Sequence, residues 1–237
     1  AFIPAYLFQT ERYFDLTGGV SFIVTVALAA VLHPAMSLRG WALCVLVAVW
    51  AARLALFLFH RIHKSGRDRR FDTMKSRFWR FLLTWTLAGA WVFVTLAAAL
   101  AAITGTDRGA LDGYLIAGAL IWGVGFVFEV VADYQKSAFR ADPNNADKFI
   151  SSGLWAWSRH PNYFGEIVLW SGIAIIAIPA LQGWQWLTLI SPVFVTLLLT
   201  RISGVPMLES SAKERWGDDP EYQRYVQRTP VLIPRPR

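Results

Sequence analysis

Six long apolar segments account for most of the 237-residue sequence and restrict it to one kind of fold. Each is roughly 20 residues long, the length that an α-helix needs to cross the hydrocarbon core of a bilayer. The alternating pattern of a β-strand is missing, and a spanning helix satisfies its own backbone hydrogen bonds. We therefore expect an all-α, polytopic integral membrane protein. The six predicted spans are 18–36, 41–60, 80–103, 111–133, 163–180 and 185–206.

The charged residues lie between these spans and predict how the chain is oriented. The sequence has 23 Lys and Arg against 16 Asp and Glu, a net charge of +7. Three polar segments, 61–80, 134–161 and 207–237, are long and basic, and six alternating helices place all three on one side. The positive-inside rule assigns that side to the cytoplasm. The chain begins with Ala, so we also expect a seventh helix upstream, and we expect one domain over 1–237.

Composition and motifs argue against several classes of function. The basic residues adjoin membrane spans, where contact with anionic lipid explains most of them, so we expect membrane lipid rather than nucleic acid as a partner. No feature indicates an obligate protein partner. The single cysteine, Cys44, cannot form an intramolecular disulfide, and the pair His60 and His63 is too small a ligand set to predict a metal site. The sequence also has no GxGxxG, P-loop or HExxH motif.

Ionisable and amide side chains at the ends of the spans mark a candidate site, because such groups are costly within a bilayer. Asp133 lies near the end of the fourth span, with Arg140 on the same helix face if that helix continues. Asn162, Glu166 and Trp170 follow one another at four-residue intervals at the start of the fifth span. The predicted topology places these residues near the cytoplasmic ends of their helices, which indicates a pocket open to the cytoplasm.

The charges around this pocket suit a phosphorylated cofactor with an uncharged reactive end. Asn162 and Glu166 can read an amide, and the region of Gln9 is predicted to lie at the same depth. A salt bridge from Glu166 to Arg201 or Arg53 that only holds helices together is the alternative for this acid. The cations suited to phosphate groups are Arg140, Lys148, Arg159 and Arg201.

The stretch 153–166, GLWAWSRHPNYFGE, resembles the cofactor-binding signature of the membrane steroid 5α-reductase and sterol reductase family, which is related to the isoprenylcysteine carboxyl methyltransferases. The closing run 221–234 is similar to the C-termini of that family. The resemblance covers 111–237 well and the first half weakly. Within the superfamily Glu166 favours the reductases, because the methyltransferases typically carry a non-acidic residue there. Asp133-Tyr134 followed by Arg140 also matches the reductase pattern, and Lys148 stands where those enzymes have a basic residue for the adenosine phosphate.

The resemblance implies NADPH-dependent reduction of a conjugated carbon–carbon double bond in a hydrophobic enone, an activity of the 3-oxo-5α-steroid 4-dehydrogenase type. The substrate would be steroid-like, and 111–237 would form most of the cofactor site. Because the sequence looks most like the bacterial branch, we expect a bacterial inner membrane with the cofactor site facing the cytoplasm. The cofactor-binding residues implied in this way are Asp133, Arg140, Lys148, Arg159, His160, Asn162, Tyr163, Glu166, Trp170 and Arg201.

The proton-donating residues are less well defined by the resemblance. The run 7–11, LFQTE, resembles the Phe-Leu-Gln-Glu sequence near the substrate in the reductases, with a shift of one residue at Glu11. In the steroid reductases a tyrosine precedes a Phe-His-Arg triplet, whereas Leu58 precedes 59–61 here. The expected catalytic groups are therefore Gln9, a protonated Glu11 and Tyr13, with Tyr6 as a further substitute.

Two other functions stay open on the sequence. A membrane methyltransferase that uses S-adenosylmethionine is favoured by 159–163, RHPNY, and disfavoured by Glu166 and by the number of phosphate-suited cations. A non-enzymatic lipid-binding or transport scaffold would explain the buried charges as a translocation path. Inverted repeats would support transport, and the sequence shows no such symmetry.

Overall fold

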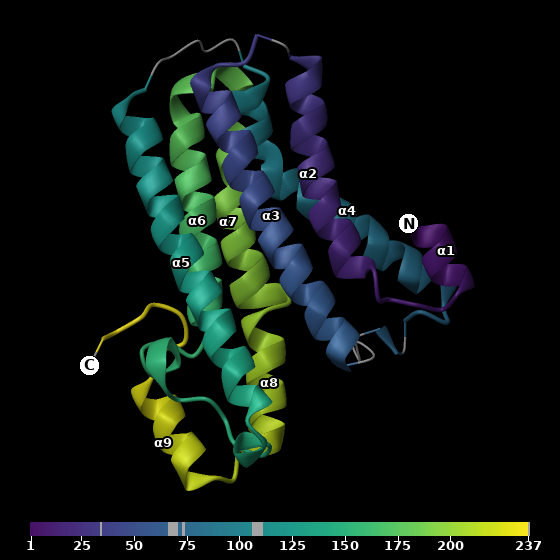
Figure 1. Cartoon of the computed structure of the whole chain (residues 1–237), viewed down its shortest axis with the longest axis vertical. Helices are drawn as coiled ribbons and strands as arrows, with labels where there is room; N and C mark the ends of the chain where they lie inside the picture. Colours follow the sequence, from purple (N-terminus) through teal and green to yellow (C-terminus); the bar gives the residue numbers. More distant parts are fainter. Residues whose placement is uncertain (34, 66–70, 73, 106–110, 237) are drawn as a thin grey trace. The chain divides into compact units, whose positions relative to one another are not determined.

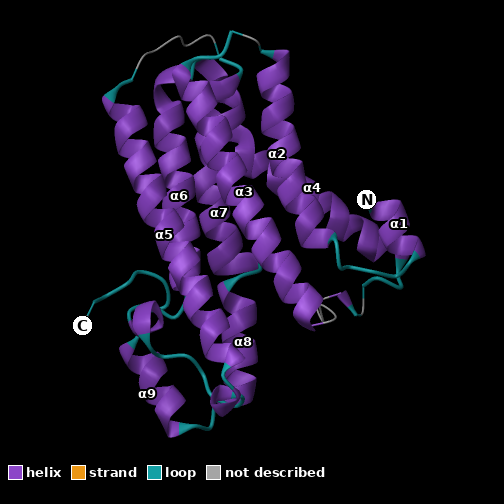
Figure 2. Cartoon of the chain, viewed as in Figure 1, coloured by secondary structure: helices purple, strands orange, loops and turns teal. Residues whose placement is uncertain are grey.

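The computed structural model describes residues 1–33, 35–65, 71–72, 74–105 and 111–236. Every regular element in these ranges is a helix, as Figure 2 shows, which confirms the all-α prediction. Six helical segments of the described chain are long and apolar enough to cross a membrane. They are Phe14–Leu32, Leu38–His63, Phe78–Ile103, Gly113–Ala141, Pro161–Ala180 and Gly183–Trp216.

The helices pack into two compact units, which are described separately (Figure 1). The first unit comprises Ala1–Asp112 and Ala177–Ser191, and the second comprises Gly113–Ile176 and Pro192–Arg237. The helices of the first unit are α1 (Phe2–Leu7), α2 (Phe14–Leu32), α3 (Leu38–Ser65) and α4 (Phe78–Ile103), with η4 (Ile178–Ala180) and η5 (Gly183–Leu189). Those of the second are α5 (Gly113–Ala141), η2 (Pro143–Asn145), η3 (Gly153–Ala156), α6 (Pro161–Ala177), η6 (Leu198–Ile202), α8 (Val205–Trp216) and α9 (Pro220–Arg228). Helix α7 (Ile190–Leu197) contains the boundary between the two units.

The core of the first unit forms where α2 packs against α3 and α4. A Cβ on Gly19 would lie 2.4 Å from the Cβ of Ala55, so the backbone of α2 approaches α3 closely at this point. Deeper in the unit the ring of Phe22 meets the rings of Trp50 and Trp91 edge-on, with centroids 5.0 Å and 5.1 Å apart. These aromatic contacts bury a large apolar area between three helices.

The second unit is organised by a close antiparallel contact between α5 and α6. Gly125 faces Gly165, and Gly118 faces Gly172, so that each helix presents a glycine every seven residues. A Cβ on Gly165 would lie 2.6 Å from the carbonyl oxygen of Gly125 and 2.6 Å from the backbone nitrogen of Glu129. Small residues let membrane helices touch backbone to backbone in this way. The contact fixes the end of α5 beside the start of α6.

The segment after α7 is interrupted, and the interruption sets the direction of α8. Leu198–Ile202 forms one π-helical turn, a feature that is frequent at functional sites. Gly204 follows, and a Cβ there would lie 2.9 Å from the ring of Tyr163. Pro206 then occupies the first turn of α8, where its missing N–H costs no hydrogen bond. This break starts a separate helix beside the first turn of α6.

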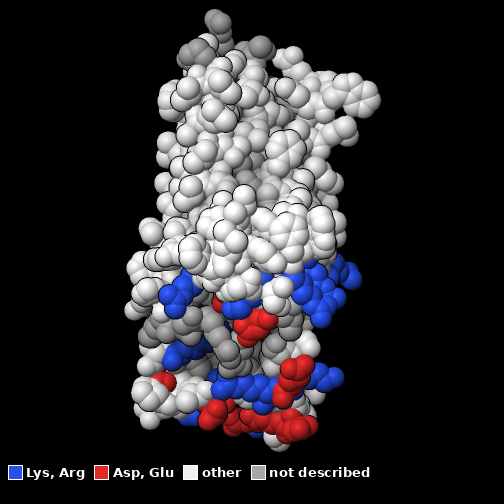
Figure 3. Space-filling view, turned by 90° about the vertical axis from the view of Figure 1, so that its right-hand side faces the viewer, with Lys and Arg blue, Asp and Glu red and all other residues white. Residues whose placement is uncertain are grey.

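Charged side chains on the face drawn in Figure 3 gather toward its lower part, and the upper part carries none. Exposed apolar residues are frequent on the spanning helices, for example Val24 on α2 and Phe93 on α4. An apolar surface that ends in a charged zone is typical of helices that lie in a bilayer. The assignment of the charged zone to the cytoplasm stays a prediction.

Candidate functional site

Residues 153–166, called the signature segment from here on, are anchored to the C-terminal part of α5. Gly153 has a φ of +59°, a backbone conformation that glycine adopts without strain, and a Cβ there would lie 2.6 Å from the side-chain amide of Gln135. That amide oxygen accepts the backbone N–H of Leu154 at 2.9 Å. Trp155 donates its indole N–H to the carbonyl of Ala132 at 3.0 Å. These bonds hold the signature segment against the part of α5 that contains Asp133.

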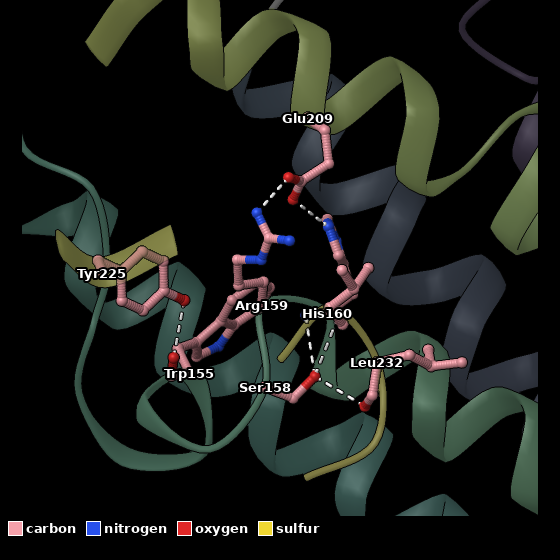
Figure 4. Close-up of polar contacts among 8 residues, drawn as sticks. Trp155, Ser158, Arg159, His160, Glu209, Tyr225 and Leu232 are labelled. Atoms are coloured by element: carbon pink, nitrogen blue, oxygen red, sulfur yellow. Dashed lines mark hydrogen bonds and ion pairs between the residues drawn. The ribbon is translucent and has the colours of Figure 1, made fainter. Parts of the chain in front are cut away.

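The closing run 221–234 packs on the signature segment, as Figure 4 shows. The hydroxyl of Ser158 donates to the carbonyl of Leu232 at 2.8 Å, and the hydroxyl of Tyr225 donates to the carbonyl of Trp155 at 2.7 Å. The backbone N–H of Arg159 donates to the carbonyl of Pro230 at 2.9 Å. Burial raises the pKa of the Tyr225 phenol, so it remains a donor. The two segments that carry the family resemblance thus form one structure.

Arg159, His160 and Glu209 form a compact charged cluster between the signature segment and α8 (Figure 4). Arg159 Nη1 lies 2.5 Å from Glu209 Oε2, and His160 Nε2 lies 2.7 Å from Glu209 Oε1. The side chains are 11%, 5% and 29% exposed, respectively. Both oxygens of Glu209 are therefore used within the protein, and they balance the charge of Arg159.

His160 offers a hydrogen-bond acceptor that the protein does not use. A carboxylate only accepts hydrogen bonds, so the ring nitrogen that faces Glu209 carries the hydrogen of the neutral imidazole. The other nitrogen, Nδ1, is buried and has no hydrogen-bond partner in the part of the chain that the structure describes. Burial lowers the pKa of His160 although Glu209 raises it, and Lys136 and Arg159 lower it further. The imidazole is thus neutral at pH 7, with Nδ1 as an open acceptor.

The low pKa of His160 makes a pH-dependent contribution to stability. A base with a lower pKa in the folded state is protonated preferentially in the unfolded state, so its contribution is fully present above about pH 6.5 and is lost as the pH falls. We expect the unfolding temperature of the purified protein to fall from about pH 7.5 to about pH 5.5, and His160→Gln to flatten that fall. The exposed His63 serves as control, and an equal slope for His63→Gln and His160→Gln would contradict this role.

A second open acceptor lies one residue into α6. Asn162 Nδ2 donates to Asp133 Oδ1 at 3.3 Å, and because a carboxylate only accepts, the amide oxygen of Asn162 must point the other way. That oxygen, Oδ1, is buried and unpartnered among the described residues. Glu166 follows one turn later on the same helix face, as predicted, because α6 begins at Pro161. The guanidinium nitrogen Nε of Arg159 is likewise buried without a partner there.

The structure brings part of the predicted cofactor set together, namely Asp133, Arg159, His160, Asn162 and Tyr163. The ring of Tyr163 lies parallel to that of His160 at 5.6 Å, and Trp170 is 1% exposed on α6. Helix α5 continues to Ala141 and has Arg140 in its last turn, so the condition under which Arg140 shares a face with Asp133 is met. Among the predicted cofactor residues, the exposed cations are Arg140, Lys148 and Arg201. The roles of all these residues toward a cofactor stay predictions.

The three predicted catalytic residues belong to the first unit, so their position opposite the cofactor residues stays a prediction. Gln9 is exposed, has a φ of +49° and donates to the carbonyl of Tyr6 at 2.7 Å. Tyr13 is 56% exposed and stacks on Phe59, with centroids 6.1 Å apart. Glu11 is 6% exposed.

The buried Glu11 is held by a lysine. Lys75 Nζ lies 3.0 Å from Glu11 Oε2. An ammonium group at this distance stabilises an ionised carboxylate, so the contact suits a charged Glu11 better than the protonated one that the sequence suggested.

Sequence reasoning missed the acid at the centre of the charged cluster. Glu209 lies in a C-terminal segment that we interpreted only as basic, and no spacing in the sequence connects it with Arg159, fifty positions away. The break at Gly204 and Pro206 was the available signal, since it starts a new helix just before Glu209. Lys136, 4.4 Å above the ring of Trp155, was missed as well.

Comparison with known proteins assigns the chain to a family. The model of a family described as "Protein of unknown function (DUF1295)" matches residues 1–229. The chain belongs to the DUF1295 family. This DUF1295 protein is also similar to two curated proteins.

The first is "Probable O-methyltransferase ustE" of Ustilaginoidea virens, 31% identical over 120 residues, 42% of this chain and 42% of the relative. The second is "3-oxo-5-alpha-steroid 4-dehydrogenase 1" of Bos taurus, 29% identical over 75 residues, 32% of this chain and 29% of the relative. The chain thus spans less than half the length of these curated relatives. No solved structure matches. The two similarities agree with a chain related both to membrane reductases and to methyltransferases.

Proposed function

We propose that this DUF1295 protein binds NADPH and reduces a conjugated carbon–carbon double bond in a hydrophobic, steroid-like enone within the membrane. The observation that carries the proposal is the amide of Asn162, whose nitrogen is fixed by Asp133 and whose buried oxygen is open. A nicotinamide carboxamide has the N–H donors that such an oxygen requires. Leaving a buried acceptor unsatisfied costs about 1–3 kcal/mol, which a ligand recovers when it binds.

The neighbouring groups fit the rest of such a cofactor. The open nitrogen of His160 is an acceptor for a ribose hydroxyl, and Arg159 Nε is an open donor. Arg140, Lys148 and Arg201 are exposed cations, which suit phosphate groups better than the neutralised Arg159 does. In one respect this proposal differs from the sequence-based expectation: the guanidinium of Arg159 is paired with Glu209, so we assign the phosphates to the three exposed cations.

When bound, NADPH supplies a hydride to the β-carbon of the enone, and negative charge develops on the carbonyl oxygen. Asn162 and Glu166 hold the carboxamide and thereby fix which face of the ring meets the substrate. The buried aromatic residue Trp170 excludes water from the same helix face. A dry site strengthens every hydrogen bond to the developing charge.

The second candidate function is methyl transfer from S-adenosylmethionine. It is favoured by the similarity to an O-methyltransferase over 120 residues. The open acceptors of His160 and Asn162 could also receive hydroxyl or amino groups of that cofactor. Glu166 and the three exposed cations are the features that favour NADPH over it. We further propose that the cofactor site faces the cytoplasm of a bacterial cell.

Ligand-induced stabilisation of the purified protein separates the two functions, because a ligand that binds only the folded state raises the unfolding temperature. We expect NADPH to stabilise strongly, NADH less and S-adenosylmethionine not at all. Loss of one charge-assisted contact costs about 1.5–3 kcal/mol, so Lys148→Ala should weaken NADPH much more than NADH. Lys213→Ala, exposed on α8, is the control. Stabilisation by S-adenosylmethionine alone would establish the methyltransferase.

A further inference from the structure

Residues 142–149, which follow α5 in the second unit, are held at both ends. Near the start of this segment, Asn145 Nδ2 donates to the carbonyl of Phe139 in α5 at 3.1 Å. At its end, the ring of Phe149 meets the ring of Tyr222 in α9 edge-on, with centroids 5.2 Å apart. The segment is therefore tied both to the helix before it and to the C-terminal part of the same unit.

Between these two points, the end of α8 holds the segment by three hydrogen bonds. Arg215 Nη2 donates to the carbonyl of Ala146 at 2.7 Å and to Asp147 Oδ1 at 3.1 Å. The indole N–H of Trp216 donates to the carbonyl of Asp147 at 2.7 Å. The guanidinium of Arg215 also lies 4.9 Å from the centre of the Trp216 ring. The last two residues of α8 thus fix both the backbone and the carboxylate of Asp147.

The residue that follows Asp147 is Lys148, the cation proposed for the adenosine phosphate of NADPH. Lys148 is exposed, and its backbone N–H donates to the carbonyl of Asn145 at 3.1 Å, which closes the turn. A carboxylate beside this lysine would repel a phosphate group and cancel the lysine's charge. Arg215 supplies the positive charge that compensates for Asp147, so that the three side chains together keep one positive charge.

The exposure of the pair argues against a mainly structural role for the guanidinium. The side chains of Arg215 and Asp147 are 52% and 97% exposed, and ion pairs this exposed contribute little to stability. The N–H of Trp216 also holds the backbone of Asp147 without any charge. Removing Arg215 should therefore leave the turn in place and change chiefly the local charge next to Lys148.

We propose that Arg215 determines the preference of this protein for NADPH over NADH, because it neutralises Asp147 and so leaves Lys148 its full charge for the 2′-phosphate. This inference rests on the proposed function and adds a positioning residue that acts through Lys148. NADH has a hydroxyl group in place of the 2′-phosphate, so the neutralisation of Asp147 matters little for its binding.

The test measures the dissociation constants of NADPH and NADH for the purified full chain by isothermal titration calorimetry. In Arg215→Met we expect the ratio Kd(NADH)/Kd(NADPH) to fall about fivefold, the effect of one unit charge roughly 4 Å away in water. The Kd of NADH and the unfolding temperature should stay at their wild-type values. Lys213→Met, which removes another exposed cation of α8, should leave the ratio unchanged.

A double variant separates the effect of charge from an effect on the turn. Arg215→Met combined with Asp147→Asn removes both charges, so the ratio should return toward the wild-type value, because Lys148 again stands beside a neutral residue. ADP-ribose with and without a 2′-phosphate, which lacks the nicotinamide, should give the same pattern as the complete cofactors. The contact is thereby assigned to the adenosine end.

A wild-type ratio in Arg215→Met, or a double variant as unselective as Arg215→Met, would overturn the role of Arg215. Wild-type protein that binds NADPH and NADH equally would overturn this inference alone. If the wild type binds neither nucleotide, the proposed function fails, and the role of Arg215 fails with it.

Discussion

Replacing Gly165 with alanine should strongly destabilise the protein. The new methyl group would lie 2.6 Å from backbone atoms of Gly125 and Glu129, which cannot move aside as a flexible side chain can. Overpacking costs about 1–3 kcal/mol, and contact with backbone places this site at or above the upper end. An unfolding temperature lower by about 6–12 °C is expected for a chain of this length.

Gly123→Ala on α5 is the matched control, because a Cβ there meets no atom within 4 Å. The same substitution in an open part of the helix should not lower the unfolding temperature, since alanine favours a helix over glycine. If Gly165→Ala were tolerated as well as Gly123→Ala, the close contact of α5 and α6 would be wrong.

Replacing Glu209 with alanine should cost both stability and cofactor binding. The change leaves the guanidinium of Arg159 without its counter-charge and removes the acceptor of His160. Breaking a buried pair costs about 3–5 kcal/mol, and the 29% exposure of Glu209 reduces the expected loss to roughly 2–3 kcal/mol. Because the ring of His160 loses its orientation, we also expect NADPH to stabilise the variant much less than the wild type.

The double variant Glu209→Ala, Arg159→Met distinguishes the effect of losing the ion pair from the effect of the Glu209 substitution on helix α8 itself. It removes both charges, so part of the lost free energy of unfolding should return, and the double-mutant cycle gives the coupling energy. Glu214→Ala, an exposed acid of the same helix, should change neither quantity. Equal unfolding temperatures for Glu209→Ala and Glu214→Ala would refute the cluster.

The fold was largely predictable because its determinants are local. A run of apolar residues specifies a spanning helix without reference to the rest of the chain, and the four-residue spacing of Asn162 and Glu166 placed them on one face of α6. The sequence left open whether the fourth span continues as a helix, and the structure shows that α5 continues to Ala141.

The pairing of distant residues was not predictable, because no periodicity connects them. Glu209 meets Arg159 only because the π-helical turn and Gly204 redirect the chain before α8. Lys75 meets Glu11 through the contact between Phe14 and Phe71. Membrane topology alone accounted for every basic residue in the segment around Lys75. Nothing in the sequence therefore distinguished Lys75, which faces the buried acid Glu11.

The most direct test of the proposed function is the transfer of a labelled hydrogen. Purified protein would be incubated with NADPH deuterated at the nicotinamide C4 position and with a 3-oxo-4-ene steroid, and the product analysed by mass spectrometry and NMR. We predict a saturated ketone with one deuterium at the former β-carbon, at a rate that falls strongly in Asn162→Leu and remains unchanged in the exposed control Lys213→Ala. An unlabelled or unreduced steroid, together with methyl transfer from S-adenosylmethionine, would contradict it.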